Sequence, residues 1–531
     1  MTELLLLLVI AGTGLGLARK LQLPAIPFWI LGGLIAGQLS WTVKTTHLEQ
    51  LLEMGLIFLV FASGMELNPS RFKHQWSIVW RVSLLQFSIL VGVGWLVAVG
   101  MGFTQREACY PAVAMGTSST LLAIRLLIQG RKMYEPFARM VIGVLLIQDL
   151  LMILLVVVLV KSDLGLTEVM KGLGGTAALG AIAWMVRQYF WAFFLRHFDS
   201  DEESFLLILL STMFLFVSGS FHFDLPLIVG AFFGGLSLSS FPIQGLAKGV
   251  MTSLSDFFFA LFFTALGLYA GIPLSIHYWI QAAVFAGLVV VVTPILVALI
   301  AERAGLTARH AIEGGILLAQ TSEFALVLGL AGHLSESSLP VERISQIALL
   351  SIMTMTITPM LSNDRVTHWL LRFHPFRNRH SVKSDWTDHV LILGFGSAGD
   401  YVIQPFVERG DQVVVVDEDP AVVAKLQAKG NVTAIRGDGV DRVLLDQLHA
   451  RRCKVILASM RRPEEAVSVI KYVDGTAPVF ARVFEPGDGE RIKKLGGIPI
   501  LNSMASSEAF LNWYQMIGKE ICRSKAKENE A

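Results

Sequence analysis

One aspartate stands alone in a long apolar stretch of the chain. Residues 140–160 carry no charge other than that of Asp149, which lies near the middle. This length and composition predict a membrane-spanning helix, and a charge at the centre of a bilayer costs about 2.5 kcal/mol or more. A carboxylate at that depth binds a proton or an alkali cation but not both at once, which is the physical basis of ion exchange. The alternative is a structural aspartate paired with an arginine of another helix.

Two other apolar segments contain polar residues at mid-depth. The first holds GTSST, residues 116–120, and the second covers residues 314–332 with Glu323 at its centre. Hydroxyl groups beside glycine compete with the hydrogen bonds of a helix, so they predict an unwound chain that lines a cavity. The alternative is that these residues bond within intact helices or at helix interfaces.

Neutral polar side chains accompany both acids. Gln148 directly precedes Asp149, and Gln320 and Ser322 lie just before Glu323. They add hydrogen-bonding capacity without a second charge. For Glu323, a structural role in holding crossed helices together is as open as a role in ion binding.

The composition indicates which parts of the chain lie in the membrane. Of the 531 residues 54% are apolar and only 16% are charged, with a mean hydropathy of +0.61, and nearly half of the charged residues follow position 382. Because a span needs about 17–25 apolar residues, we expect an α-helical membrane part with about thirteen transmembrane helices. The expected spans are 3–18, 24–39, 52–66, 77–103, 108–128, 139–161, 172–195, 204–219, 225–240, 251–270, 275–300, 311–334 and 342–361.

The Lys and Arg residues between the spans predict the topology. Odd-numbered loops hold fourteen of them and even-numbered loops five. The odd loops are therefore expected in the cytoplasm, with the N-terminus outside and the C-terminal part inside. The first span is expected to be retained rather than cleaved as a signal peptide. A net charge of +1 gives no sign of nucleic-acid binding, and three cysteines form neither a disulfide framework nor a metal motif, so no tightly bound metal is expected.

Interrupted segments in both halves, each close to a buried acid, are typical of secondary transporters built from inverted repeats. The ends of the half-helices supply partial charges at mid-depth, and Asp149 supplies a full one.

The membrane part resembles the monovalent cation:proton antiporter-2 family, which includes the Kef-type potassium efflux systems. The resemblance is carried by LQLPAIPFWILGGLIAG (21–37), LLEMGLIFLVFASGMEL (51–67), GTSSTLLAIRLL (116–127), QDL (148–150), VGAFFGGLSLS (229–239), DFFFALFFTALGL (256–268) and AQTSEFALVLG (319–329). It implies a homodimer in the bacterial inner membrane, with a scaffold and a mobile ion-carrying domain. It also implies a cation and proton site on Asp149, helped by Thr117, Ser118, Ser119 and Thr120 in one unwound segment and by Gln320, Ser322 and Glu323 in the other.

The sequence departs from this family at two places. Thr293 stands where many relatives carry a lysine, so Asp149 lacks that candidate salt-bridge partner. The loop after the ninth span carries Lys248 and no acid before Asp256, unlike the acidic loop of Kef systems controlled by glutathione. The first departure leaves the stoichiometry open, and the second does not favour glutathione control.

A glycine motif marks the start of a second domain. The strand-like run VLIL leads into Gly394, Gly396 and Gly399, a second run VVVVD ends at Asp417, and a helix is expected between them. This is the G-x-G-x-x-G spacing in the strand–turn–helix context that dinucleotide binding requires. Phosphate is expected at the helix N-terminus and the ribose hydroxyls at Asp417. The alternative is a Rossmann-like module that has lost its ligand and serves only in dimerisation.

Further alternating strands and helices resemble the KTN domain, the N-terminal part of RCK domains. The resemblance implies that Asp438, in a GDG turn, faces the adenosine and that Arg482 lies near the ligand or the dimer seam. Phe395 and Ser397, inside the glycine turn, are counted with this site. NAD, NADH or AMP is the expected regulatory ligand.

We therefore expect residues 1–365 to form an exchanger, 366–388 a linker, 389–510 a Rossmann-like nucleotide-binding domain and 511–531 a polar tail. The predicted function is exchange of K⁺, in preference to Na⁺, for protons under nucleotide control, and not enzymatic catalysis. Two alternatives are a ligand-gated potassium channel, against which no T-V-G-Y-G filter is present, and a membrane-anchored NAD-dependent oxidoreductase, for which no catalytic group is evident.

Overall fold

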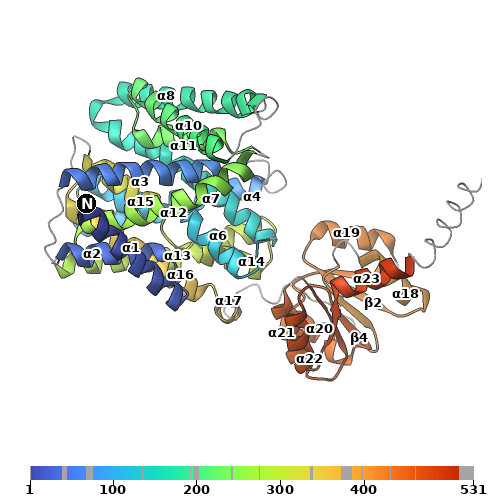
Figure 1. The fold of residues 1–531 in the computed structure, drawn as a ribbon. Coiled ribbons are helices and arrows are strands. Elements are labelled where there is room, and N and C mark those ends of the chain that lie inside the picture. The colour runs from blue at the N-terminus through green and yellow to red at the C-terminus, as the bar shows by residue number, and fades with distance from the viewer. Residues whose placement is uncertain are drawn as a thin grey trace, which may run out of the picture. The chain divides into compact units, whose positions relative to one another are not determined.

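The computed structural model divides the chain into two units, Met1–Leu370 and Leu371–Ala531 (Figure 1). It describes residues 2–38, 45–66, 76–133, 135–191, 193–194, 202–240, 243–273, 275–334, 339–371, 386–395, 399–430, 432–460 and 462–513. In the described part of the N-terminal unit all regular elements are helices, and the C-terminal unit is built on a parallel sheet.

The helices of the N-terminal unit follow one another with short connections. They are α1 (Thr2–Leu21), α2 (Ala25–Gln38), α3 (Thr45–Glu66), α4 (Trp76–Gly100), α5 (Gln105–Gly116), α6 (Thr120–Gln129), α7 (Pro136–Lys161), η2 (Ser162–Leu164), α8 (Leu166–Met185), η3 (Val186–Phe190), α10 (Glu202–His222), α11 (Leu227–Ser237), α12 (Ile243–Ala270), α13 (Ile276–Arg303), α14 (Ala308–Leu317), α15 (Phe324–Leu334), α16 (Val341–Leu361) and α17 (Asp364–Leu371).

These helices match the thirteen spans expected from the sequence. Within the described residues, ten segments are long and apolar enough to cross a membrane, and α5 with α6 forms one of them. The shorter α2 and α11 and the interrupted pair α14 and α15 complete the set. The protein is thus a multi-pass membrane protein, as predicted.

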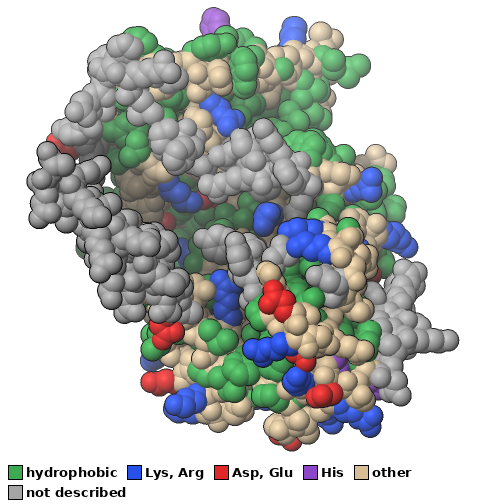
Figure 2. All heavy atoms as spheres, turned by 90° about the vertical axis from the view of Figure 1, so that its right-hand side faces the viewer, with side chains coloured by type: hydrophobic (Ala, Val, Ile, Leu, Met, Phe, Trp, Pro, Cys, Tyr) green, Lys and Arg blue, Asp and Glu red, His purple; other side chains and the backbone are tan. Residues whose placement is uncertain are grey.

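Helices on the outside of this unit expose apolar side chains. On α8 and α10, Leu166, Trp184, Leu207, Leu215 and Phe221 each expose more than half of their surface. Figure 2 shows hydrophobic side chains at the top of the view, where Figure 1 places these two helices. Such a surface suits contact with lipid, because water would penalise it by about 25 cal/mol for each Å² left exposed.

The two halves of the membrane unit repeat one packing plan. In the first half α2 packs on α1, and α4 packs on α5 and α7. In the second half α11 packs on α10, and α13 packs on α14 and α16. The second helix of each half also crosses the third helix of the other half, so α2 packs on α12 and α11 on α3. This exchange confirms the expected inverted repeats.

Glycine permits both of these exchanged crossings. A Cβ atom added to Gly33 of α2 would lie 2.1 Å from the carbonyl oxygen of Thr264, and one added to Gly235 of α11 would lie 2.0 Å from that of Phe61. No side chain fits at such distances, so the backbones meet directly. Gly267 of α12 and Gly64 of α3 show the same approach from the opposite side.

The helices also fall into two spatial groups. The first three helices of each half, α1–α3 and α10–α12, pack mainly on one another, and we call them the scaffold group. The remaining helices, α4–α7 and α13–α16, pack mainly on one another around the two interruptions, and we call them the core group.

The C-terminal unit is a Rossmann-like domain, as predicted. Its strands are all parallel and lie in the order β3-β2-β1-β4-β5-β6. The strands are β1 (Val390–Leu393), β2 (Val413–Asp417), β3 (Thr433–Arg436), β4 (Val455–Ala458), β5 (Val479–Val483) and β6 (Ile498–Leu501). The helices are α18 (Gly399–Glu408), α19 (Pro420–Lys429), α20 (Arg442–Gln447), η4 (Ala450–Arg452), α21 (Pro463–Val473), α22 (Pro486–Lys494) and α23 (Asn502–Trp513).

Alternate residues of the central strands face two separate cores. Val390 and Ile392 pack with side chains of α18 and α19, whereas Leu391 and Leu393 pack with side chains of α20 and α21. Both faces of the sheet are therefore covered by helices, which explains why these strands read as continuous apolar runs.

Cysteine has a packing role in this domain. Cys453 is buried, with its Sγ 3.1 Å from Nε2 of His389. Burial raises the pKa of the Cys453 thiol to about 12, so it remains protonated near neutral pH. In the described residues Cys109 and Cys453 are free thiols.

Candidate functional site

The helix pair α5 and α6 is interrupted at the GTSST sequence. Helix α5 ends at Gly116, and Thr117 continues with extended backbone angles (φ −112°, ψ 146°). The Ser119 side chain accepts a hydrogen bond from the backbone N–H of Leu122 and so begins α6. The hydroxyl groups thus stabilise a break, as the sequence predicted.

The second interruption lies between α14 and α15 and crosses the first. The backbone N–H of Ser322 donates to the carbonyl oxygen of Thr117 at 3.1 Å, and the Ser118 hydroxyl donates to the carbonyl oxygen of Leu318 at 2.8 Å. The amide of Gln320 adds a bond to the Ser119 carbonyl at 3.3 Å. Buried backbone N–H and C=O groups of the two unwound segments thus find hydrogen-bond partners in one another's segment.

Asp149 lies against this crossing. The side chain is buried on α7, and its Oδ2 accepts hydrogen bonds from the hydroxyls of Thr120 and Ser63, both at 3.0 Å. Thr120 begins α6 in the core group, whereas Ser63 belongs to α3 in the scaffold group. In the described part of the chain no Lys or Arg forms an ion pair with Asp149, so the structural alternative of a buried salt bridge finds no support there.

Gln148 links the same helix to the first interruption. Its Oε1 accepts from the backbone N–H of Ser118 at 3.0 Å, and its Nε2 donates to Oε1 of Gln86 at 3.1 Å. Both amide ends are therefore engaged, and the side chain fixes the distance between α7 and the unwound segment.

Glu323 lies at the start of both half-helices. It directly precedes α15, and its carboxyl group interacts electrostatically with Ser119 and Leu121 at the start of α6. Helix N-termini carry a partial positive charge, so this position favours a carboxylate. Its Oε2 and the Oε1 of Gln320 are buried and have no hydrogen-bond partner among the described residues, which leaves acceptor capacity for a ligand.

Thr293 is buried on α13, and its hydroxyl likewise has no partner in the described structure.

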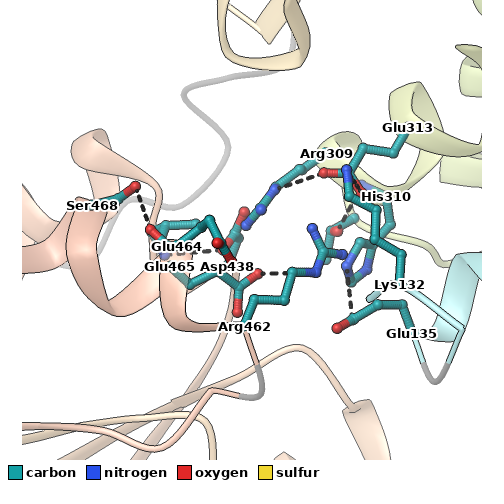
Figure 3. Close-up of polar contacts among 12 residues, drawn as sticks. Lys132, Glu135, Arg309, His310, Glu313, Asp438, Arg462, Glu464, Glu465 and Ser468 are labelled. Carbon is teal, nitrogen blue, oxygen red and sulfur yellow. Dashed lines mark hydrogen bonds and ion pairs between the residues drawn. The ribbon is translucent and has the colours of Figure 1, made fainter. Parts of the chain in front are cut away.

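A charged cluster ties the start of α14 to the chain before α7 (Figure 3). Glu313 pairs with Arg309 at 3.2 Å and with Lys132 at 3.6 Å, and His310 lies 3.5 Å from Glu135. Arg309, His310 and Glu313 are almost fully buried. We call these five residues the α14 cluster.

A second cluster ties the start of α16 to α5 and α13. The guanidinium of Arg343 lies 3.0 Å from a carboxylate oxygen of Glu107, 3.2 Å from Oε1 of Gln281 and 3.7 Å from the ring centroid of Phe103. Gln346 donates to the same Gln281 oxygen at 3.1 Å. This α16 cluster is partly buried and stands at the equivalent place in the other repeat, so ion pairs hold both ends of the core group together.

The glycine turn of the C-terminal unit meets the acid of the second strand. Gly394 follows β1 with φ +78°, a conformation that glycine adopts without strain. The backbone N–H of Phe395 donates to Oδ2 of Asp417 at 2.8 Å, and the N–H of Asp419 donates to Oδ1 at 2.8 Å. Gly399 begins α18. Gly396 and Ser397 lie outside the described residues.

These residues lie where the strand order reverses. From β1 the chain adds β2 and β3 on one side of the sheet, and it then adds β4, β5 and β6 on the other side of β1. Ligands of such sheets bind at this switch point, between β1 and β4. Asp438 follows β3, and its Oδ1 accepts from the N–H of Val440. Arg482 lies on β5 with its guanidinium 4.8 Å from the ring centroid of Phe484, so it is two strands away from β1. The structure thus joins Gly394, Phe395 and Asp417 closely and leaves Arg482 more remote.

Comparison with known proteins agrees with this architecture. The family model described as "Sodium/hydrogen exchanger, transmembrane" matches residues 5–363. The chain belongs to the sodium/hydrogen exchanger family. A TrkA-N domain model matches residues 390–502. The protein is therefore a membrane transporter that exchanges cations for protons and carries a C-terminal TrkA-N domain.

Two curated relatives align with most of this chain. The chloroplastic K(+) efflux antiporter 3 of Arabidopsis thaliana is 24% identical over 532 residues, which cover 90% of this chain and 67% of that protein. The putative cation/proton antiporter YbaL of Escherichia coli (strain K12) is 21% identical over 479 residues, 86% of this chain and 85% of that protein. Both are named as transporters and not as enzymes.

A solved structure shares the fold of the membrane unit. The sodium proton antiporter MjNhaP1 of Methanocaldococcus jannaschii matches 70% of this chain and 96% of its own length, with a TM-score of 0.55 and 17% identity.

Sequence reasoning missed two side chains around the candidate site of this exchanger. Ser63 contacts Asp149, and Gln86 contacts Gln148. Neither has a signal of its own in the sequence, because a single serine or glutamine in a span is common at helix interfaces. Only the folded structure brings them to residues about sixty or more positions away.

Proposed function

We propose that this exchanger moves K⁺ outward against protons through alternating exposure of Asp149. The observation that carries the proposal is the buried carboxylate of Asp149, held by two hydroxyls beside two crossed, unwound segments. A buried unpaired charge is costly, and either a bound proton or a bound cation removes that cost. One occupant excludes the other, so each passage of the site across the membrane carries one kind of ion.

The oxygen atoms around Asp149 suit an alkali cation. Thr117, Ser118, Ser119 and Thr120 offer hydroxyl and carbonyl oxygens, and Gln320 and Glu323 keep acceptor atoms without partners among the described residues. Hard monovalent cations prefer such ligands. In this proposal Gln148 and Ser322 position the unwound segments, and Glu323 neutralises the half-helix ends while its unpaired oxygen faces the ion.

Alternating access would arise from movement of the core group against the scaffold group. The hydrogen bond from Ser63 to Asp149 is a polar link between these groups, and it must break when they slide. The preference for K⁺ over Na⁺ is supported by the relative named as a K(+) efflux antiporter.

We further propose that an adenine nucleotide, NAD(H) or AMP, binds at Gly394 and Asp417 and shifts the balance between transport states. The glycine turn, the acid at the end of β2 and the switch-point position support this site. Phe395, Gly396, Ser397 and Gly399 would surround the phosphates, and Asp438 would face the adenosine. A ligand regulates only through unequal affinity for the two states.

The wider arrangement is also part of the proposal. The exchanger unit would span residues 1–365, the linker 366–388, the nucleotide domain 389–510 and the tail 511–531. The protein would work as a homodimer in the bacterial cytoplasmic membrane, with its N-terminus outside and its nucleotide domain in the cytoplasm, and Arg482 near the dimer seam.

Transport by the purified protein tests this function. Reconstituted on a solid-supported membrane, it should give K⁺-dependent currents or pH changes that a proton gradient drives, with smaller responses to Na⁺ and Li⁺. Potassium flux without any coupled proton movement would instead indicate a channel and would overturn exchange.

Replacing Asp417 with Ala should weaken nucleotide binding by about tenfold or more, because a charged hydrogen-bond acceptor for ribose is lost. Titration of the full-length protein with NAD, NADH and AMP by calorimetry measures this. Asp411→Ala is the control, since Asp411 lies before the opposite end of the same strand, where it pairs with Lys454 at 2.7 Å. Equal affinity in the two variants would remove Asp417 from the site.

A further inference from the structure

An ion pair joins two scaffold helices close to the proposed cation site. Glu66, the last residue of α3, accepts through its Oε1 from the ammonium of Lys248 near the start of α12, at 2.8 Å. The Glu66 side chain is 18% exposed, whereas that of Lys248 is 59% exposed. The acid is thus mostly buried, and its partner reaches it from the surface.

Glu66 also faces the interior site. It follows Ser63 by three residues, so the two side chains share one face of α3, and Ser63 donates to Asp149. The charge of Glu66 acts on both Asp149 and Glu323. Its second oxygen, Oε2, is buried and has no partner among the described residues. One oxygen is therefore held by Lys248, and the other is left unpaired in the interior.

We propose that Glu66 attracts the transported cation at the entrance to the Asp149 site and that Lys248 competes with the cation for it. This inference rests on the proposed function of Asp149. When the ammonium lies on Glu66, the charge at the entrance is balanced. When Lys248 turns into solvent, two nearby carboxylates, Glu66 and Asp149, draw a cation inward.

The properties of the pair suit such competition. The Lys248 ammonium is exposed and well hydrated, so its separation from Glu66 costs little free energy. An ion pair of this kind is weak, and salt screens it. Cations at cellular concentration can therefore replace it. The backbone that carries Glu66 is held in place, because Gly64 of the same helical turn lies directly against α11, where its Cβ would be 2.2 Å from the carbonyl oxygen of Phe232.

The topology predicted from Lys and Arg places this entrance on the cytoplasmic side. The loops after α3 and before α12 are the third and ninth, which are both expected in the cytoplasm. The charge pair would then act on the cation that enters from the cell interior.

Cation titrations of four variants test this role. The full-length protein is reconstituted in vesicles with its cytoplasmic face outward, and proton movement is recorded at rising K⁺. Glu66→Gln should raise the KM for K⁺ by about fivefold through loss of local attraction, with a maximal rate within about twofold of the parent. Lys248→Gln should lower the KM by about twofold to threefold, because the competing cation is gone. Glu66→Asp and Lys248→Arg, which keep each charge, should restore values near those of the parent.

The opposite signs of these effects separate the proposal from a structural link between α3 and α12. A merely structural pair predicts that Glu66→Gln and Lys248→Gln both lower the maximal rate or the yield, and that the shift in KM has one sign. That result, or an equal shift in vesicles of inverted orientation, would overturn the proposal. An unchanged KM in both neutral variants would overturn it as well.

The double variant and a salt series give independent checks. The KM for K⁺ of the double variant Glu66→Gln, Lys248→Gln should match that of Glu66→Gln alone, because Lys248 no longer has a carboxylate with which to pair. The difference in KM between the parent and Glu66→Gln should shrink as choline chloride is added, because salt screens the charge. If Asp149→Asn retained exchange in the same vesicles, the proposed function would fail. If Asp149→Asn is inactive and Glu66→Gln is unchanged, only the role of Glu66 fails.

Discussion

The Asp149→Asn variant is expected to fold, to insert into the membrane and to lose exchange by about 100-fold or more. Asparagine keeps the size of the side chain and its acceptor for Ser63 and Thr120, but it neither takes up a proton nor balances a cation. Without a carboxylate at this depth, neither ion is held at the site in turn, so the coupled step is lost. Proton movement driven by a K⁺ gradient in reconstituted vesicles measures the loss.

The matched control for this experiment is Thr176→Val. Thr176 is also buried in a membrane helix, and its hydroxyl donates only within α8, to the carbonyl oxygen of Gly172. This variant should retain most of the parent rate. Exchange near the parent rate in Asp149→Asn, with equal amounts of folded protein, would remove Asp149 from the mechanism.

The Gly235→Ala variant is expected to damage assembly of the scaffold group. The added Cβ would lie 2.0 Å from the carbonyl oxygen of Phe61, so α11 and α3 must separate. Overpacking in a tight core costs about 1–3 kcal/mol in stability. Here the added methyl group would meet a backbone atom, which cannot move aside by changing a side-chain rotamer. Thermal unfolding followed by size-exclusion chromatography in detergent should show a marked loss of folded protein.

Gly287→Ala provides the comparison. Gly287 lies on the membrane helix α13, and a Cβ there meets nothing within 4 Å. It should be neutral or slightly stabilising, because alanine is the better helix former. Similar melting of both variants would show that the close crossing is not required for stability.

The sequence contained enough to predict the membrane architecture. Apolar length and charge placement predicted the thirteen segments, and hydroxyls beside glycine predicted both interruptions, which the structure places at residues 117–119 and 318–323. The G-x-G-x-x-G spacing between two apolar strands predicted the Rossmann-like unit. These features depend on local composition, which is why a single sequence reveals them.

Features that depend on long-range packing were not predictable in the same way. The bond from Ser63 to Asp149 joins helices 86 positions apart. The pairing of Glu66 with Lys248 spans 182 positions. No local pattern marks such partners, because a polar residue in a span acquires its role only when another helix packs against it.

The roles of individual site residues remain predictions. The structure places Gln148, Thr120 and Asp149 together and sets Glu323 at the half-helix ends, where a structural role is equally consistent with its contacts. In the nucleotide domain Asp417 holds the glycine turn itself, a function that the ribose-binding pattern alone did not suggest.

The α14 and α16 clusters bear on how the exchanger deforms. Each holds one end of the core group together with ionic contacts, buried in the α14 cluster and partly buried in the α16 cluster, at equivalent places in the two repeats. Separating such ion pairs is expensive where they are shielded from water, so the core helices should move as one rigid block, and shear should concentrate along the seam with α2, α11 and α12. Engineered disulfide bonds between two core helices would then leave transport intact, whereas one disulfide bond between a core helix and a scaffold helix would stop transport.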